Sequence, residues 1–167
     1  MGEPVLVGER VTLRPAAEAD LPALIAIRQT PEVTAWWGLG SVADDLASPD
    51  EVVLAVLLDG QVVGAIQWYA EEEPDFRHAG IDVYLDPAVH GRGVGTDAVR
   101  TLARYLIHER GYHRLVIDPA ADNLPAIRCY AKVGFRPVGV MRQYWRNPVG
   151  QWRDGLLMDL LASELSG

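Results

Sequence analysis

A short glycine-rich stretch in the middle of the chain constrains the fold more than any other feature. The stretch His90-Gly-Arg-Gly-Val-Gly-Thr96 follows a strand-like run, 78–85, and opens a run with helical periodicity, about 94–110. The first N–H groups of a helix have no partner within it, and the helix dipole favours negative charge there. Glycines let the backbone approach phosphate oxygens closely. The stretch therefore predicts a loop that binds an anion such as a diphosphate.

Other glycine-rich motifs fit this stretch less well. A P-loop is excluded because no Gly-Lys-Ser/Thr sequence follows the glycines. The loose dinucleotide-binding pattern matches 93–98, but that pattern belongs directly after the first strand of a repeated βαβ unit. Here an antiparallel hairpin precedes the loop, and 86–89 separates the strand from it. If the loop is considered alone, a plain turn that caps a helix remains an alternative.

Strand and helix patterns alternate along the rest of the chain. The runs 52–58 and 61–69 are joined by Asp59-Gly60, a dipeptide that tolerates the positive φ angles of a tight hairpin turn. This order of elements predicts one α/β domain, 1–167, with helices packed against a mixed sheet. The other predicted elements are a strand at 11–14, a helix at 18–29, a mobile loop or short helices at 36–50, a strand at 78–85, a helix at 94–110, a strand at 115–118, a helix at 123–133, and a hairpin from 135 to 161 with its turn at 147–150.

The charge of the chain limits its partners. With 23 acidic and 15 basic side chains, the net charge is -8. Such a surface repels nucleic acid and attracts cations, so we expect a cationic small molecule as ligand and no nucleic-acid partner. The apolar runs are too short to cross a bilayer, and the lone Cys129 forms neither an internal disulfide nor a zinc site. We expect a cytoplasmic protein without a metal or a membrane partner.

Several segments together resemble the GNAT acetyltransferase superfamily, in the order and spacing of that family. They are Gly80-Ile-Asp82, His90 to Gly95, and Asp118 through Asn123 to Phe135. The family signature is Gln/Arg-x-x-Gly-x-Gly/Ala, and this chain departs from it by having His90 at the first position. The resemblance implies a central mixed, mostly antiparallel twisted sheet flanked by helices. It also implies an N-acetyltransferase that uses acetyl-CoA as cosubstrate.

Within the superfamily, the chain is most similar to the aminoglycoside 6′-N-acetyltransferases. The similarity extends from about Arg10 to Phe135 and is only generic from Arg136 onward. A homodimer contact through the C-terminal hairpin, with Trp145 and Trp152, is an alternative to a monomer. The segments that carry the similarity are Glu32 to Gly38, Gln67 to Tyr69, Gly80 to Asp82, and Asp118 to Tyr130.

The resemblance also assigns residues to the cosubstrate. It implies that Asn123 hydrogen-bonds the pantetheine arm, that Ala126 belongs to the cosubstrate site, and that backbone groups of Val83 and Leu85 bind the same arm and polarise the thioester carbonyl. Tyr130 matches the tyrosine that protonates the leaving thiolate, and a core or cofactor-stacking tyrosine is the alternative. The residues implied for the pyrophosphate are His90, Gly91, Arg92, Gly93, Val94, Gly95 and Thr96.

The transfer itself requires a base. An alkyl amine is mostly protonated at neutral pH, so a carboxylate or a water chain must accept a proton before the nitrogen can attack. Asp82 lies in the strand that leads to the loop, and Asp118 lies at the end of the next strand, so both are expected to face one cleft. Which of the two acts as base stays open. The alternatives are that Asp118 caps the turn before Pro119 and that Asp82 pairs with an arginine.

For the acceptor, Trp36 and Trp37 are expected to form an aromatic wall. The expected substrate is the 6′-amine of an aminoglycoside, which would make this an antibiotic-resistance enzyme. A protein N-terminus, a ribosomal protein or a polyamine is the alternative acceptor, and a non-catalytic acyl-CoA-binding or aminoglycoside-binding protein is the alternative of another class. A negative rim for a cationic sugar is expected from Tyr69, Glu71, Glu72, Glu73 and Asp75, although such a charge run is also typical of a solvated loop.

Overall fold

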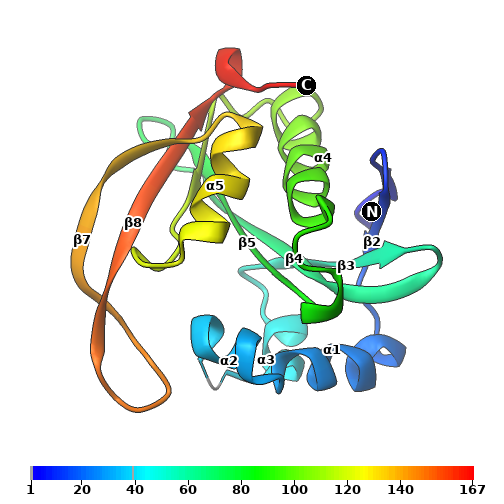
Figure 1. Cartoon of the computed structure of the whole chain (residues 1–167). Helices are drawn as coiled ribbons and strands as arrows, with labels where there is room; N and C mark the ends of the chain where they lie inside the picture. Colours follow the sequence, from blue (N-terminus) through cyan, green and yellow to red (C-terminus); the bar gives the residue numbers. More distant parts are fainter. Residues whose placement is uncertain (1, 39) are drawn as a thin grey trace.

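A twisted eight-stranded sheet runs through the molecule in the computed structural model, which describes residues 2–38 and 40–167 (Figure 1). The strand order is β1-β2-β3-β4-β5-β6-β8-β7, and all neighbouring strands are antiparallel except β5 and β6. The predicted mixed, mostly antiparallel sheet is confirmed. The strands are β1 (Leu6–Val7), β2 (Val11–Pro15), β3 (Val52–Leu58), β4 (Gln61–Glu71), β5 (His78–Leu85), β6 (Arg114–Ile117), β7 (Arg136–Arg146) and β8 (Trp152–Leu161).

Helices cover both faces of the sheet. Figure 1 shows α4 (Val94–His108) and α5 (Leu124–Val133) on one face, and α1 (Leu21–Arg28), α2 (Pro31–Trp37) and α3 (Val42–Ala47) on the other. Alternate side chains of a strand point to opposite faces. Ile81 of β5 therefore packs into the core beneath α4, whereas Tyr84 packs against α1 to α3. Asp82 lies two residues before Tyr84, so its side chain points to the same face of the sheet, the one covered by α1 to α3.

Most predicted elements are present, and the differences lie mainly at their ends. In the hairpin turn, Asp59 and Gly60 have φ angles of 51° and 78°, as the sequence predicted. The stretch 36–50 contains the end of α2 and all of α3, and Leu39 within it lies outside the described residues. The first turn of the predicted helix at 18–29 is a 3-10 turn, Glu18–Asp20, and α4 ends at His108 rather than Arg110. The sequence analysis missed β1, which has only two residues.

The N-terminal hairpin is fixed to the start of α4 by a buried carboxylate. Asp97 accepts hydrogen bonds from the backbone N–H groups of Glu9 (3.1 Å), Arg10 (2.7 Å) and Val11 (2.9 Å). These bonds join segments that are far apart in the sequence. They place the side chain of Arg10 beside the glycine-rich loop, where its Nη1 donates to the carbonyl of Arg92 (3.0 Å).

The sheet opens between β5 and β6. The two strands pair only at Ala79 with Leu115 and at Gly80 with Val116. Beyond these pairs β5 stays with β4 as far as Leu85, while β6 pairs with β8 on its other side. The parallel strands therefore diverge toward their C-terminal ends, and an opening forms at the centre of the sheet. Among the described residues, no helix has the length and apolar character needed to cross a bilayer.

Candidate active site

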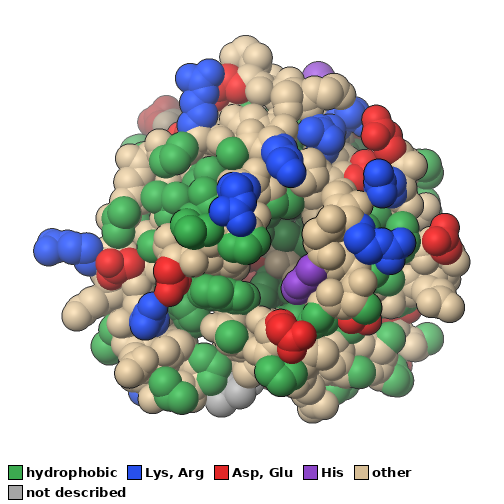
Figure 2. All heavy atoms as spheres, in the orientation of Figure 1, with side chains coloured by type: hydrophobic (Ala, Val, Ile, Leu, Met, Phe, Trp, Pro, Cys, Tyr) green, Lys and Arg blue, Asp and Glu red, His purple; other side chains and the backbone are tan. Residues whose placement is uncertain are grey.

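A cleft of about 330 Å³ lies where β5 and β6 diverge. Figure 2 shows this face of the molecule hollowed near its centre, with hydrophobic side chains beside the hollow and Lys and Arg side chains above it, over α4 and α5. The cleft receives side chains from both faces of the sheet. It is lined by Trp36, Trp37, Asp82, Val83, Ile117, Asp118, Pro119, Ala120, Asn123, Tyr130, Tyr144 and Trp145.

The two predicted carboxylates meet in this cleft. The carboxyl group of Asp82 makes no hydrogen bond or ion pair with any described residue, so the predicted alternative of an arginine partner does not hold. Burial, reinforced by the carboxylates of Asp118, Glu51 and Asp45, raises the pKa of Asp82 to about 7. Burial also raises the pKa of Asp118, although a hydrogen bond from the hydroxyl of Tyr144 opposes this rise. Asp82 is thus a carboxyl group that exchanges protons near neutral pH.

Tyr130 reaches the same cleft from α5. Its side chain is buried, and its ring packs edge-on against Phe135 with 6.4 Å between the ring centroids. Burial, together with the nearby Cys129, Asp82 and Asp118, raises the pKa of the Tyr130 hydroxyl. This hydroxyl therefore keeps its proton at neutral pH and can act only as a proton donor there.

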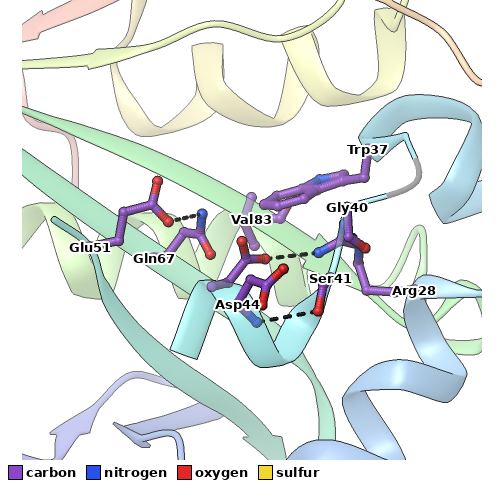
Figure 3. A network of polar contacts seen from close by, with 9 residues as sticks. Arg28, Trp37, Gly40, Ser41, Asp44, Glu51, Gln67 and Val83 are labelled. Carbon is purple, nitrogen blue, oxygen red and sulfur yellow. Dashed lines mark hydrogen bonds and ion pairs between the residues drawn. The ribbon is translucent and has the colours of Figure 1, made fainter. Parts of the chain in front are cut away.

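The adjacent tryptophans have different environments. Trp36 is 40% exposed at the rim of the cleft. Trp37 is packed: its indole Nε1 donates to the carbonyl of Val83 (3.1 Å; Figure 3). Its ring stands edge-on to Tyr84 with 4.8 Å between centroids. The Val83 carbonyl, which was expected to bind pantetheine, accepts this hydrogen bond. Trp37 therefore links α2 to β5.

A buried arginine holds the aromatic wall in place. Arg28 of α1 is only 6% exposed, and its guanidinium lies 4.9 Å from the ring centroid of Trp37. It donates to the carboxylate of Asp45 (3.1 Å) and to the carbonyl of Gly40 (3.1 Å). Figure 3 shows Arg28 reaching toward the segment that carries Ser41 and Asp44. One side chain thus joins α1 to the segment between α2 and α3 and to α3 itself.

A third carboxylate, that of Glu51, extends the acidic surface formed by Asp82 and Asp118. Gln67 pairs with Asp82 across the two strands, and its side-chain Nε2 donates to Glu51 Oε2 (2.7 Å; Figure 3). The ring of Tyr69 covers Gly80, where a Cβ would lie only 2.1 Å from it. Burial and the charges of Asp118, Asp82 and Glu51 raise the pKa of Tyr69 to about 12. Glu51 therefore belongs to the acidic surface around Asp82, although sequence analysis did not select it.

Two residues predicted for the negative rim lie elsewhere. Glu72 lies beside a second cavity of about 980 Å³, which also contains Glu51 and Tyr69. Its carboxylate accepts hydrogen bonds from the hydroxyl of Tyr112 and from Arg77 (3.1 Å), and these bonds lower its pKa. Glu73 is exposed in the loop after β4. The structure does not bring Glu72 and Glu73 together with Asp82 and Asp118.

The glycine-rich loop has the backbone of an anion cradle. Gly91 and Gly93 have φ angles of 76° and 78°, which only glycine adopts at little cost. Gly93 is the N-cap of α4, and no side chain caps the helix there. The first N–H groups of α4 are therefore free of a capping side chain, and the guanidinium of Arg10 lies beside them. This arrangement fits a diphosphate.

Three other side chains of this region have partners within the protein, whereas Arg92 is exposed and its guanidinium makes no hydrogen bond with a described residue. His90 Nε2 lies 2.9 Å from the carbonyl of Leu85, at the end of β5. Thr96 Oγ1 lies 3.2 Å from Cys129 Sγ, so its hydroxyl faces α5. Asn123 caps α5 by accepting the N–H of Ala126 (3.3 Å), and its side chain also lines the cleft. The loop thus offers its backbone groups and the exposed guanidinium of Arg92 to a diphosphate.

Comparison with known proteins gives the family. The family model described as an acetyltransferase (GNAT) domain matches residues 10–136. The chain belongs to the GNAT acetyltransferase family. This GNAT protein is an acetyl-CoA-dependent N-acetyltransferase, as the resemblance in the sequence implied.

Three relatives show how far the similarity extends. Aminoglycoside N(6′)-acetyltransferase type 1 of Klebsiella pneumoniae is 32% identical over 155 residues, which cover 80% of this GNAT chain and 77% of that protein. N-alpha-acetyltransferase RimI of Mycobacterium tuberculosis is 29% identical over 149 residues, 86% of each chain. The solved structure of AAC(6′)-Ib in complex with paromomycin and acetyl-CoA has a TM-score of 0.76 and 28% identity, covering 93% of this chain and 96% of that one.

Four residues near the site were not predicted to belong to it, although Trp145 was considered for a dimer contact. Tyr144 and Trp145 enter the cleft from β7, beyond the segment in which the similarity to the aminoglycoside enzymes was evident. Arg10 and Glu51 lie just before a strand, where a charged residue is common and carries no signal of its own. Their positions beside the loop and the cleft become evident only in the folded chain.

Proposed function

We propose that this GNAT protein acetylates a primary amine of a cationic small molecule, and that the amine is the 6′-amine of an aminoglycoside. The observation that carries this proposal is the acidic character of the cleft. The carboxylates of Asp82 and Asp118 line it beside the aromatic ring of Trp36, and Glu51 adds a third negative charge nearby. Opposite charges and aromatic faces both favour a polycationic sugar.

In this proposal Asp82 is the general base. A base is most effective when its pKa lies near the working pH, because it is then ionised often enough and still basic enough. The pKa of Asp82, raised to about 7 by burial and neighbouring carboxylates, meets that condition. Asp118, which accepts a hydrogen bond from Tyr144, acts as the anion that binds the acceptor ammonium.

Tyr130 completes the proton balance. When bound, acetyl-CoA supplies the acetyl thioester. The bound ammonium first loses one proton to Asp82, which passes it to solvent. The new N–C bond then replaces the C–S bond, the second proton of the nitrogen passes to Asp82, and the proton of the Tyr130 hydroxyl passes to the sulfur. The raised pKa of Tyr130 supports this role because the hydroxyl is protonated before transfer. The residue regains its proton from solvent after the thiol leaves.

The cosubstrate is proposed to enter from the side of α4. The backbone of 91–96 and the guanidinium of Arg10 would hold the pyrophosphate, while Asn123 and Ala126 of the α5 start and the edge of β5 at Val83 and Leu85 would flank the pantetheine arm. The opening between β5 and β6 then leads from the loop toward Asp82 and Tyr130.

A matched pair of aminoglycosides tests the proposal. Neomycin carries a 6′-amine, and paromomycin differs from it by a 6′-hydroxyl in the same place. Thiol release from acetyl-CoA should be observed with neomycin, kanamycin and tobramycin and be absent with paromomycin. Equal rates with neomycin and paromomycin would place the acetyl group on another amine and contradict the proposed regiochemistry.

The same assay includes the rival acceptors. The similarity to RimI makes peptides with free N-termini the second acceptor class, and spermidine represents polyamines. Thiol release with peptides alone, or with spermidine alone, would overturn the aminoglycoside proposal. If calorimetry detects binding of acetyl-CoA and of an aminoglycoside but no amine releases thiol, the protein is a binding protein and the catalytic proposal fails.

A further inference from the structure

We propose that Tyr144 is a positioning residue of the acceptor site, whose hydroxyl fixes the carboxylate of Asp118 as the anion that receives the acceptor ammonium. The proposal rests on the proposed function of the cleft. Tyr144 belongs to β7, a strand at the edge of the sheet, and its hydroxyl donates a hydrogen bond to Asp118 Oδ2. No part of the sequence analysis gave this residue a role.

A bulge in the C-terminal hairpin directs Tyr144 toward the cleft. The register pairs Met141 with Gly155 and Trp145 with Arg153, so three residues of β7 lie opposite a single residue of β8. Gln143, in the middle of the bulge, has a φ angle of 51°, which is uncommon for a residue other than glycine. Bulges of this kind redirect side chains and recur next to active sites.

Two contacts with β8 stabilise the bulge. Asp154 is the residue opposite it, and its Oδ1 accepts the backbone N–H of Gln143 (2.9 Å). Asp154 also binds Trp145 Nε1 through its backbone carbonyl (3.3 Å). The unusual backbone of Gln143 is therefore held by a specific side chain, and removal of the Asp154 carboxylate is expected to release it.

Gly155 provides the surface on which the Tyr144 ring lies. A Cβ at this position would come within 2.7 Å of Tyr144 Cδ2. Gly155 also forms a bridge to Ala120, and Leu156 N–H donates to the carbonyl of Pro119 (2.8 Å). The segment that follows Asp118 is thus fixed to Gly155, on which the Tyr144 ring lies, and to its neighbour Leu156. The hydroxyl and the carboxylate are positioned relative to each other by β8.

The charges around Asp118 explain why a hydrogen-bond donor is needed there. The groups that face it are Asp82 from β5, Tyr69 from β4, Tyr130 from α5 and Tyr144 from β7, and none of them is a cation. Burial raises the pKa of Asp118, and the hydrogen bond from Tyr144 is the first factor that lowers it, followed by the N–H of Asp118 itself. Without the Tyr144 hydroxyl, the carboxylate of Asp118, which is proposed to bind the acceptor ammonium, would be protonated over a wider pH range.

The test is the substitution Tyr144→Phe, which keeps the ring on Gly155 and removes only the hydroxyl. Losing one hydrogen bond to a charged group should raise KM for the amine by roughly tenfold. KM for acetyl-CoA should not change, and as the pH is lowered the amine KM should begin to rise at a higher pH than in the wild type. Asp154→Ala, which releases the bulge, should reproduce these effects. Tyr105→Phe is the matched control, because its hydroxyl donates to Glu3 (3.0 Å), outside the cleft.

A second measurement separates this proposal from the proposed function. In protein labelled with ¹³C at aspartate carboxyl groups, NMR titration reports the ionisation of Asp118 without any acceptor, and Asp118→Asn identifies its signal. Tyr144→Phe should raise the midpoint of that titration, and an unchanged midpoint would overturn the proposal. An unchanged amine KM in an enzyme that acetylates amines would overturn it as well. If the wild-type protein acetylates no amine, the proposed function fails, and the titration still decides whether Tyr144 controls Asp118.

Discussion

Asp82 lies directly opposite Gln67 on the antiparallel strands β5 and β4, yet the Gln67 side-chain amide donates to Glu51 (2.7 Å) and not to Asp82. The carboxyl group of Asp82 forms no hydrogen bond with any described residue. Its ionisation is therefore governed by burial and by neighbouring carboxylates, with no donor to stabilise the anion. This pairing leaves one carboxyl group in the cleft poised to exchange a proton near neutral pH.

The first prediction concerns the pH dependence of catalysis. If Asp82 is the base, kcat/KM for the amine should rise with pH and level off above an apparent pKa of about 7. Asp82→Asn should lower kcat by roughly 10²-fold to 10⁴-fold, the usual contribution of a general base, and abolish this limb. Initial rates of thiol release between pH 5 and 9 measure both effects. Asp44→Asn, on the exposed side of α3, is the control. A variant Asp82→Asn with the wild-type profile would assign the base to another group.

The same pKa has a consequence for stability. The pKa of Asp82 is raised from 3.8 in the unfolded chain to about 7 in the fold, so folding favours the protonated form. The contribution of Asp82 to the free energy of unfolding is then fully present below pH 4 and is lost as the pH rises through 7. Asp82→Asn stays neutral, so its advantage over the wild type should grow by about 2 to 3 kcal/mol between pH 5 and 8. Urea unfolding at the two pH values measures it, and an advantage independent of pH would contradict the raised pKa.

Local patterns in the sequence predicted most of the fold. The apolar runs of β3 and β4, the Asp59-Gly60 turn and the apolar stripe of α4 are properties of neighbouring residues, so they can be recognised without knowing the rest of the chain. The predicted site residues Asp82, Asp118 and Tyr130 line one cleft because the family pattern fixes the elements that carry them.

The remaining features depend on contacts between distant parts of the chain. The bulge that turns Tyr144 toward Asp118 depends on Asp154 and on the absence of a side chain at Gly155. Glu72 was assigned to the acceptor rim from its sequence neighbours alone. Its actual partner Tyr112 lies 40 residues away, after α4. No local pattern reports such contacts, and a charged residue in a loop carries the same signal whether it binds a ligand or its own protein.

The guanidinium of Arg10, beside the cosubstrate loop, gives a further prediction. Arg10 is held beside the start of α4 by the hydrogen bond of its N–H to Asp97 (2.7 Å), and its guanidinium contacts the carbonyl of Arg92. Arg10→Ala should weaken binding of CoA by roughly tenfold through loss of a charged contact to phosphate. Binding of S-acetylpantetheine, which lacks the diphosphate, should not change. Calorimetry with both ligands measures this, and Arg136→Ala, on β7, is the control. An equal loss for both ligands would mean that Arg10 acts only through the fold of the loop.

The final prediction separates the two tryptophans, which the sequence treats alike. Trp36 is 40% exposed at the rim of the cleft, whereas Trp37 is packed between Arg28 and Tyr84 and donates to the Val83 carbonyl. Trp36→Ala should therefore raise KM for the amine by roughly tenfold, the effect of losing one aromatic contact to a cation, and leave the free energy of unfolding within about 0.5 kcal/mol of the wild type.

Trp37→Ala should act on both quantities. Removing a packed aromatic ring and its hydrogen bond should lower the free energy of unfolding by about 3 kcal/mol, and the loosened α2 should raise the amine KM as a secondary effect. Urea unfolding and amine kinetics of the two variants, measured side by side, test the distinction. If Trp36→Ala destabilises the protein as much as Trp37→Ala does, Trp36 is part of the core, and its role is to stabilise the fold rather than to bind the amine. If neither variant changes the amine KM, the acceptor does not bind against α2.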